Sequence, residues 1–502
     1  MKRRDFLKTA GLTAAGTAGA ATLGAIPPAA AQCAPVGRSP VPRGSRILIR
    51  GGYIVTLDPK LGELRGDVLI DDGKIAAVGK NLAAGSAEVI DASNMMVVPG
   101  FIETHRHTWQ SCLRHIGGNW SAAQYFGYNF FKFGVNMRPE DVYAANLIGR
   151  LAALDGGITT LLDWSHIMNT PAHADAAVHA LRDAGGRSVF AMGWPQAPDP
   201  SKWITSKAGK STADIPDDIR RVRKAHFSDN TGLVTLAMAG RGPDFAVIDQ
   251  VRRDLLIARD LAIPTTIHIG FAVPGGIQAM KEAGLLGPDI THVHVHDSTP
   301  EELQMIVDSG GTTSISPLDE MMRVRWRRTL PPVISTIEKG LVVSLSVDSE
   351  STSDGSMFSI MRNALAVGRI QVSNPLDQRP EPKDFSAAAL ITTNKIFEMA
   401  TIDGAKTLGL DKRTGSISVG KAADLMLLRM DDLSYYPVID AINAIVIAAD
   451  KASVDAVFVA GKPLKFGGRL VDDALVQRAS RLARESRDYL FQKGGYKMPA
   501  DL

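Results

Sequence analysis

A chain of 502 residues can bury a large core, and its length suggests two to three domains. Hydrophobic residues make up 45% and charged residues 22%, which is ordinary for a globular protein. Residues 1–31 hold four basic residues and one acidic residue, so the remainder, with 52 of each sign, is formally neutral. This balance argues against nucleic acid or an anionic membrane as a partner, and no later apolar run reaches the roughly 18 residues that a membrane span needs.

The first 31 residues have the parts of a signal peptide: a basic start, a stretch of small apolar residues and a run of alanines. The segment RRDFLK, beginning at Arg3, resembles a twin-arginine export motif. We therefore expect the twin-arginine translocase as a partner and the periplasm as the destination, reached in the folded state. A disordered or amphipathic basic tail is the alternative. The only cysteines, Cys33 and Cys112, lie in a leader and in a barrel segment, so we expect no disulfide framework.

The two ends of the chain share a pattern of short strands and tight turns. Near the start, segments 46–57, 67–70 and 74–78 alternate or run apolar, and similar segments return at 415–430 and 454–464. We therefore predict a small composite β-sandwich formed from residues 41–98 and 413–470.

The middle of the chain alternates between strand-like and helix-like segments. The strand-like segments are 95–102, 158–163, 187–193, 233–238, 263–268, 290–296, 312–316 and 341–348. The helix-like segments include 139–155, 172–184, 247–261, 300–309 and 357–370. Eight such repeats predict the α/β class and a (β/α)8 TIM-type barrel over residues 99–412, with its chemistry at the carboxyl ends of the strands. In the final part, 471–502, we predict a helix over 472–492 that docks on the body or on a second subunit, which would make the chain a homo-oligomer.

Three of the predicted strands end in residues that bind metals. His105 and His107 close the first strand after a Pro-Gly turn, and side chains two apart on a strand project to the same side. His268 ends the fifth strand, where the alternative is a core histidine. Asp348 ends the eighth strand, where the alternative is a helix N-cap. Three imidazoles and one carboxylate suit one divalent ion, zinc or alternatively iron, and leave a position for water. The sixth strand adds His292, His294 and His296 on one face, and the residues alone do not say which of them acts.

The sequence resembles the amidohydrolase superfamily, in the branch that contains triazine chlorohydrolases and aminohydrolases and cytosine deaminase-like and guanine deaminase-like enzymes. The motifs that carry the resemblance are PGFIETHRH at 99–107, GITT at 157–160, GAKTLG at 404–409 and GKAADL at 420–425. The resemblance implies His105, His107, His268 and Asp348 as metal ligands. It also implies His294 as the catalytic histidine, with His292 and His296 as its neighbours.

Two departures from the family pattern bear on the chemistry. Deaminases of this branch usually carry a glutamate three residues after the fifth-strand histidine, where this chain has Phe271. Binuclear relatives use a lysine on the fourth strand, whereas residues 233–239 contain none. We therefore expect a single metal ion, and deamination of a heterocycle by the usual route does not follow.

The expected enzyme is a metal-dependent amidohydrolase that cleaves a non-peptide carbon–nitrogen bond of a small amide, urea-like or cyclic substrate. The metal would lower the pKa of its water towards about 7, Asp348 would act as general base and then acid, and His294 would polarise the electrophilic group. We expect the substrate to be lined by Trp109, Gln110, Trp164, His166 and Phe271. The alternatives are an aminohydrolase or chlorohydrolase of an N-heterocycle, a lyase, or a binding or scaffold protein that has lost a ligand.

Overall fold

The computed structural model describes residues 40–196, 218–270, 275–322, 330–373 and 391–497. The predicted signal peptide, residues 1–31, and the predicted substrate-lining residue Phe271 lie outside these ranges.

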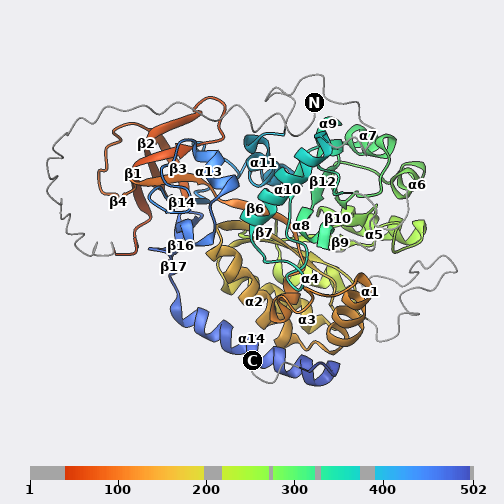
Figure 1. Cartoon of the computed structure of the whole chain (residues 1–502). Coiled ribbons are helices and arrows are strands. Elements are labelled where there is room, and N and C mark those ends of the chain that lie inside the picture. The colour runs from red at the N-terminus through yellow and green to blue at the C-terminus, as the bar shows by residue number, and fades with distance from the viewer. Residues whose placement is uncertain (1–39, 197–217, 271–274, 323–329, 374–390, 498–502) are drawn as a thin grey trace, which may run out of the picture. The chain divides into compact units, whose positions relative to one another are not determined.

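Eight parallel strands form a barrel that is nearly closed, as the sequence predicted (Figure 1). In chain order they are β6 (Phe101–Arg106), β7 (Ile158–Ser165), β8 (Arg187–Met192), β9 (Val234–Gly240), β10 (Thr265–Ile269), β11 (Ile290–His294), β12 (Thr312–Ile315) and β13 (Val343–Leu345). Each strand pairs with the next, and one parallel bridge between Arg106 and Asp348 joins the first strand to the segment after the last. The barrel is therefore closed at its carboxyl end, where the predicted ligands lie.

The prediction of the first barrel strand needs a correction. Residues 95–102 were expected to form one strand, but the chain passes from one sheet to another within them. β5 (Met95–Pro99) pairs with β14 (Leu425–Arg429), and the barrel strand β6 begins only at Phe101. Gly100 lies at the transition, where a Cβ atom would come within 2.1 Å of Thr159 Cγ2. Close contact with the neighbouring strand β7 explains why a glycine stands at this crossing.

Helices follow the barrel strands and cover the barrel (Figure 1). Those at predicted positions are α2 (Pro139–Asp155), α3 (Pro171–Asp183), α5 (Ile248–Asp260), α7 (Pro300–Ser309) and α10 (Met357–Ser373). The others are α1 (Ala122–Tyr125), α4 (Asp218–His226), α6 (Gly276–Glu282), α8 (Pro317–Met322), α9 (Val333–Glu338), α11 (Thr393–Met399), α12 (Ile402–Thr407) and α13 (Ala441–Ile447). Local sequence sets the bounds of α7: Thr299 and Glu302 form a capping box, and Gly310 ends the helix with a φ of 75°.

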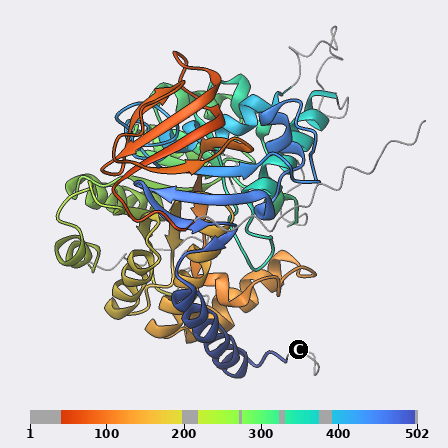
Figure 2. The ribbon, with the colours of Figure 1, turned by 90° about the vertical axis from the view of Figure 1, so that its left-hand side faces the viewer.

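The second sheet contains strands from both ends of the chain, as predicted, and Figure 2 shows them side by side. Its order is β17-β16-β15-β14-β5-β1-β2-β3, and β4 pairs with β1. The remaining bounds are β1 (Arg46–Val55), β2 (Glu63–Asp71), β3 (Lys74–Gly79), β4 (Glu88–Asp91), β15 (Val454–Val459), β16 (Lys462–Phe466) and β17 (Arg469–Leu470). The sheet has its own apolar core, which includes Ile54, Val97 and Phe458.

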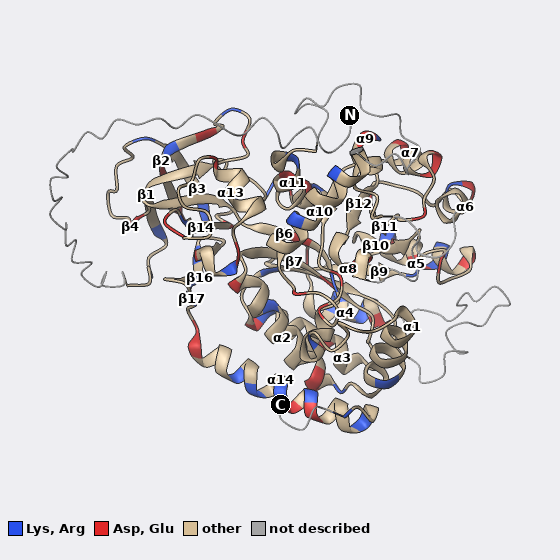
Figure 3. Cartoon of the chain, viewed as in Figure 1, with Lys and Arg blue, Asp and Glu red and all other residues tan. Residues whose placement is uncertain are grey.

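The predicted C-terminal helix is α14 (Asp473–Gly494), and it docks on the body of the same chain. It packs against α2 and against a π-helix, η2 (Phe126–Phe133). The Arg138 guanidinium lies 3.6 Å from the centre of the Tyr489 ring. Figure 3 shows both basic and acidic residues on the helices, in keeping with the neutral balance of the sequence. Within the described part of the chain, no helix is long and apolar enough to cross a membrane.

Candidate metal centre

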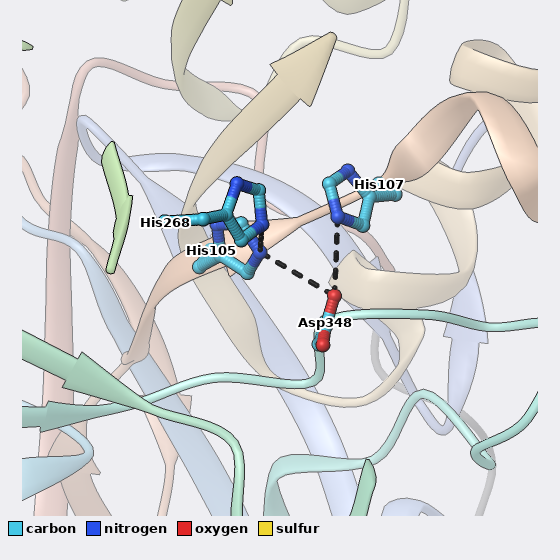
Figure 4. Close-up of side chains that lie close together, drawn as sticks. All are labelled: His105, His107, His268 and Asp348. Carbon is cyan, nitrogen blue, oxygen red and sulfur yellow. Dashed lines mark hydrogen bonds and ion pairs between the residues drawn. The ribbon is translucent and has the colours of Figure 1, made fainter. Parts of the chain in front are cut away.

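The four predicted ligands come together at the carboxyl end of the barrel (Figure 4). His105, His107, His268 and Asp348 each contribute a ligand atom, and these atoms all lie within 4.8 Å of one another. The Asp348 Oδ1 atom is 3.1 Å from His107 Nε2 and 3.4 Å from His105 Nε2, and His268 Nε2 is 3.2 Å from His105 Nε2. All four side chains are buried. We call these four residues the ligand cluster.

The histidines of the ligand cluster direct ring nitrogens towards a common point. His107 Nδ1 lies 2.9 Å from the carbonyl oxygen of Trp164, so its N–H is directed there and the lone pair of Nε2 faces the cluster. Burial lowers the pKa of His105 to about 3 and the pKa of His268 well below its usual value. Two neutral imidazole nitrogens that face each other, beside a carboxylate, are suited to share a cation.

The backbone at Asp348 is held in an uncommon conformation. Its φ is 65°, and its N–H donates to His105 O at 3.0 Å while its carbonyl accepts from His107 N–H at 2.8 Å. A left-handed residue other than glycine costs roughly 1–2 kcal/mol, which the bonds on both sides offset. The next helix, α10, begins only at Met357, so Asp348 is not the helix N-cap that was the alternative.

His294 is the sixth-strand histidine that reaches the ligand cluster. Its Nε2 atom lies 3.8 Å from Asp348 Oδ2, and its Nδ1 atom lies 2.7 Å from Glu320 Oε1. The backbone φ of His294 is 78°, so the strand ends in a left-handed turn at this residue. His292 instead lies 3.2 Å from Thr312 O through its Nδ1, and burial lowers its pKa to about 4. His296 is buried but lies outside the ligand cluster.

Glu320 was missed by the sequence reasoning. It lies on α8, directly after β12, and its Oε1 also accepts the Ser316 N–H at 3.1 Å. Glu320 and its partner His294 are both buried, so the carboxylate holds the imidazole with little competition from water. The feature of the sequence that could have indicated Glu320 is a carboxylate about one helical turn after the seventh barrel strand.

Beside the ligand cluster lies a pocket with an empty volume of about 400 Å³, including its open mouth. We call it the aromatic pocket. The members of the ligand cluster that line it are His107, His268 and Asp348, and His294 lies beside them. Its other lining residues are Tyr125, Phe126, Phe130, Trp164, His166, Trp194 and Phe245. Burial lowers the pKa of His166 well below its usual value, and Asp348 is the one acidic residue among the described lining residues.

The structure places the residues that were predicted to line the substrate differently from one another. Trp164 and His166 line the aromatic pocket. Trp109 and Gln110 do not, because the 3₁₀ helix η1 (Thr108–Leu113) turns them into the interior, where both are fully buried. Trp109 packs there with its ring centre 5.7 Å from that of Phe130. The aromatic-rich segment at 125–133, which supplies part of the pocket wall, was the feature of the sequence that could have indicated this wall.

A buried ion network lies behind the two histidines of the first strand. Arg106 is 2.8 Å from Glu103 and 3.0 Å from Glu350, and all three side chains are almost completely buried. Glu103 also accepts the N–H of Val347 at 3.1 Å. The network therefore ties β6 to the segment that carries Asp348, and each buried charge has a partner of opposite sign.

Curated proteins that are similar to this chain include two deaminases. The chain is 25% identical over 455 residues to a 5'-deoxyadenosine deaminase of Methanosarcina acetivorans, covering 88% of this chain and 98% of the relative. It is 24% identical to a 5-methylthioadenosine/S-adenosylhomocysteine deaminase of Pyrococcus furiosus, covering 85% and 96%.

Two solved structures share the fold. One is an atrazine chlorohydrolase of Arthrobacter aurescens complexed with zinc, with a TM-score of 0.73, 21% identity, and coverage of 87% of this chain and 100% of that one. The other is an adenosine deaminase of Xanthomonas campestris with bound zinc, with a TM-score of 0.70, 20% identity, and coverage of 89% and 100%. The model of the amidohydrolase family matches residues 96–464. Because this match spans most of the chain, the protein belongs to the amidohydrolase family and is a hydrolase of carbon–nitrogen bonds other than peptide bonds, as the sequence predicted.

Proposed function

We propose that the enzyme hydrolyses a non-peptide carbon–nitrogen bond in a small, flat, uncharged amide, urea-like or cyclic substrate. The observation that carries this proposal is the position of the ligand cluster beside the aromatic pocket. Apolar ring faces bind a flat molecule and exclude water from it. The polar groups beside those faces are the ones that hydrolysis requires.

The cofactor that fits the cluster best is one zinc ion. His105, His107 and His268 would hold it through nitrogen and Asp348 through Oδ1, a donor set that suits zinc and also ferrous iron. The 3.2 Å approach of two imidazole nitrogens and the neutral state of the buried rings support this fit. A bound divalent ion supplies Lewis-acid chemistry and a water molecule with a pKa lowered towards about 7. Bound zinc in two proteins of the same fold supports the choice.

The side chains around the cluster divide the work of proton transfer between them. Asp348 takes the proton of the attacking water through Oδ2 and returns it to the leaving nitrogen. His294 presents Nε2 to the electrophilic group and stabilises the charge that develops on it. Glu320, at 2.7 Å from Nδ1, fixes the orientation of the His294 ring. The aromatic pocket orients the substrate and excludes bulk water.

The second candidate is an aminohydrolase or chlorohydrolase of an N-heterocycle. The named activities of the relatives, two deaminases of adenosine compounds, favour it. Phe271, at the position where such deaminases usually carry glutamate, weighs against it, and this residue lies outside the described part of the chain. The product separates the two candidates: an aminohydrolase or chlorohydrolase replaces the exocyclic amine or chloride by oxygen and leaves the heterocycle intact, whereas cleavage of an amide or urea gives a carboxylate or carbamate.

The test combines metal analysis with a screen of amides, ureas, lactams and heterocyclic amines, in which ammonia and amine release are followed. We expect about one metal ion per chain, and we expect D348N to reduce turnover by at least about 10³-fold because it removes the proton acceptor. The control is D354N, which changes an exposed acid just before α10 that accepts the N–H of Ser356. Full activity in D348N would overturn the proposed mechanism.

We further propose that the chain reaches the periplasm through the twin-arginine translocase. The basic, alanine-rich leader and its RRDFLK segment support this, and they lie outside the described residues. Cell fractionation of a variant with lysine at positions 3 and 4 is the test, with retention in the cytoplasm as the expected result.

A further inference from the structure

A chain of hydrogen bonds runs from the wall of the aromatic pocket to Asp348. Gln110 Nε2 donates to Tyr125 Oη at 2.9 Å, and Tyr125 Oη lies 2.6 Å from Ser349 Oγ. Ser349 Oγ then donates to Asp348 Oδ1 at 3.4 Å. These four residues lie on three separate segments: η1, the end of α1, and the segment after β13. The fold therefore brings these four side chains together from three segments, and no single helix or strand explains why they meet.

The carboxylate of Asp348, at the end of this chain of hydrogen bonds, fixes the direction in which the bonds are donated. An ionised carboxylate only accepts, so the single hydroxyl hydrogen of Ser349 is directed to Asp348. Ser349 Oγ must then accept from the Tyr125 hydroxyl, which in turn accepts from the Gln110 amide. Behind Gln110, its Oε1 accepts from Ser351 Oγ at 2.9 Å, and Asn129 Nδ2 donates to Ser351 Oγ at 2.9 Å. All the donors point towards Asp348, an alignment in which each bond polarises the next.

This chain of hydrogen bonds fixes the orientation of its side chains and does not conduct protons. An amide N–H does not exchange its proton as a hydroxyl relay does, and the chain passes through the amide of Gln110. The side chains of Gln110 and Ser349 are fully buried and Tyr125 is 2% exposed, so water does not replace a lost link. Removing one link would leave a buried polar group without its partner.

The two oxygens of Asp348 have different surroundings. Oδ1 faces His105 and His107 and accepts from Ser349, whereas Oδ2 is the oxygen on the side of His294. A donor on Oδ1 therefore sets the rotation of the carboxylate and keeps Oδ2 towards the reacting groups. Tyr125 joins this arrangement to the substrate site, because its ring lines the aromatic pocket while its hydroxyl belongs to the chain.

We propose that Tyr125 is a positioning residue of the reaction, which acts through Ser349 to orient the carboxylate of Asp348. The proposal rests on the proposed function, in which Asp348 is the proton acceptor. It deepens that function in one respect: a flat substrate that packs on the Tyr125 ring contacts the residue that orients the base. Pocket occupancy and base geometry are thereby coupled through one side chain.

The test is Y125F, which deletes the hydroxyl and keeps the ring. With the substrate found by the screen, we expect kcat to fall about 10- to 100-fold, the usual effect of losing a partner of a metal ligand, and KM to stay within about twofold. The matched control is Y128F, since Tyr128 lies on the π-helix that directly follows Tyr125 and stacks on Trp120 without lining the aromatic pocket. S349A removes the last link, and the double variant should lose no more than S349A alone, because both changes break one chain.

A second readout needs no turnover. In the Co²⁺-loaded protein, we expect S349A, and in the same direction Y125F, to weaken Co²⁺ binding about 10-fold and to shift its visible absorption bands, with Y128F unchanged. Thermal unfolding checks that each variant is folded. Wild-type kcat and wild-type Co²⁺ affinity in both Y125F and S349A would overturn the proposal, as would a raised KM with unchanged kcat. Failure of the proposed function looks different: D348N would stay active, or no substrate would turn over, while the Co²⁺ readout would still test the chain.

Discussion

At the scale of single residues, the site depends on two side chains whose backbone leaves the barrel in a left-handed conformation. Asp348 and His294 have φ values of 65° and 78°; His294 is the last residue of β11, and Asp348 lies in the segment just after β13. Such residues persist only where surrounding contacts hold them. For Asp348 the contacts are the backbone bonds to His105 and His107. For His294 the contact is the carboxylate of Glu320.

The role of Glu320 leads to a prediction for E320Q. The amide keeps the size of the side chain but removes the negative charge that faces His294 Nδ1. An amide can turn either its oxygen or its N–H towards Nδ1, so it no longer fixes the orientation and proton arrangement of the ring. We expect kcat to fall by about 10²-fold or more with metal content unchanged, by analogy with the loss of a carboxylate that orients a catalytic histidine.

The control for E320Q is E301Q, the same change at an exposed position on α7, the helix that follows the strand carrying His294. Steady-state kinetics and metal analysis of the two variants decide the matter. Equal kcat in E320Q and the wild type would show that Glu320 does not position His294.

The sequence allowed the ligands to be predicted but not the residues that support them. His105, His107, His268 and Asp348 each end a predicted strand, and the closure of a barrel brings strand ends together whatever the loops do. The supporting residues, Glu320, Tyr125 and Ser349, act through contacts with residues far away in the sequence, and no local sequence pattern predicts such contacts. For the same reason the sequence could not show that Trp109 and Gln110, which follow a strand end, are turned inwards by η1.

At the scale of elements, the wall of the aromatic pocket is a short helical segment that is braced from behind. η2 carries Phe126 and Phe130 into the pocket, and π-helical turns of this kind often occur at functional sites. The helix α14 packs against η2. The Phe133 ring lies 5.9 Å from that of Phe491 and 6.1 Å from that of Tyr496.

This packing predicts the effect of F491A. Removing the ring takes away the support behind η2, so the pocket wall becomes less well ordered while the ligand cluster and its proton acceptor stay in place. We expect KM to rise several-fold with kcat within about twofold of the wild type, which is the opposite division from Y125F. Because Phe491 is only partly buried, we expect stability to fall by about 2 kcal/mol, less than for a fully buried phenylalanine.

The control for F491A is R481A, at an exposed position of the same helix. Kinetics and chemical denaturation distinguish the two. An unchanged KM in F491A would mean that η2 keeps its shape without α14.

At the scale of the whole molecule, the alternation of strands and helices was sufficient to predict the barrel, because a parallel sheet with helical crossovers has few ways to fold. The second sheet followed from the strand patterns at both ends. The boundary between the two was harder to place, because the apolar run at 95–102 contains no polar break. Its division at Gly100 depends on the approach of Thr159 from the neighbouring strand, which only the folded molecule shows.

Because a bound ion would help to close the barrel, we expect metal binding to affect the stability of the whole molecule. The seam between β6 and the segment after β13 contains one bridge, Arg106 to Asp348, while the other neighbouring strands pair over several residues. The ligand cluster spans this seam. His105 and His107 lie on one side of the seam, Asp348 lies on the other side, and His268 lies across the barrel. A bound ion would therefore link the ends of the barrel where its own hydrogen bonds are fewest.

We accordingly expect removal of the metal to lower the melting temperature by several degrees. An ion present at about 1,000 times its Kd stabilises the folded state by about 4 kcal/mol, and this stabilisation should return when Zn²⁺ is added back. Calorimetry with and without chelator measures the shift, and hydrogen exchange should show the loss of protection first in β6 and β13. In H268N, which lacks one ligand, the chelator should have little effect. Equal melting temperatures for metal-loaded and metal-free wild type would show that the ion serves the chemistry alone and that the ion network of Arg106 is sufficient to close the barrel.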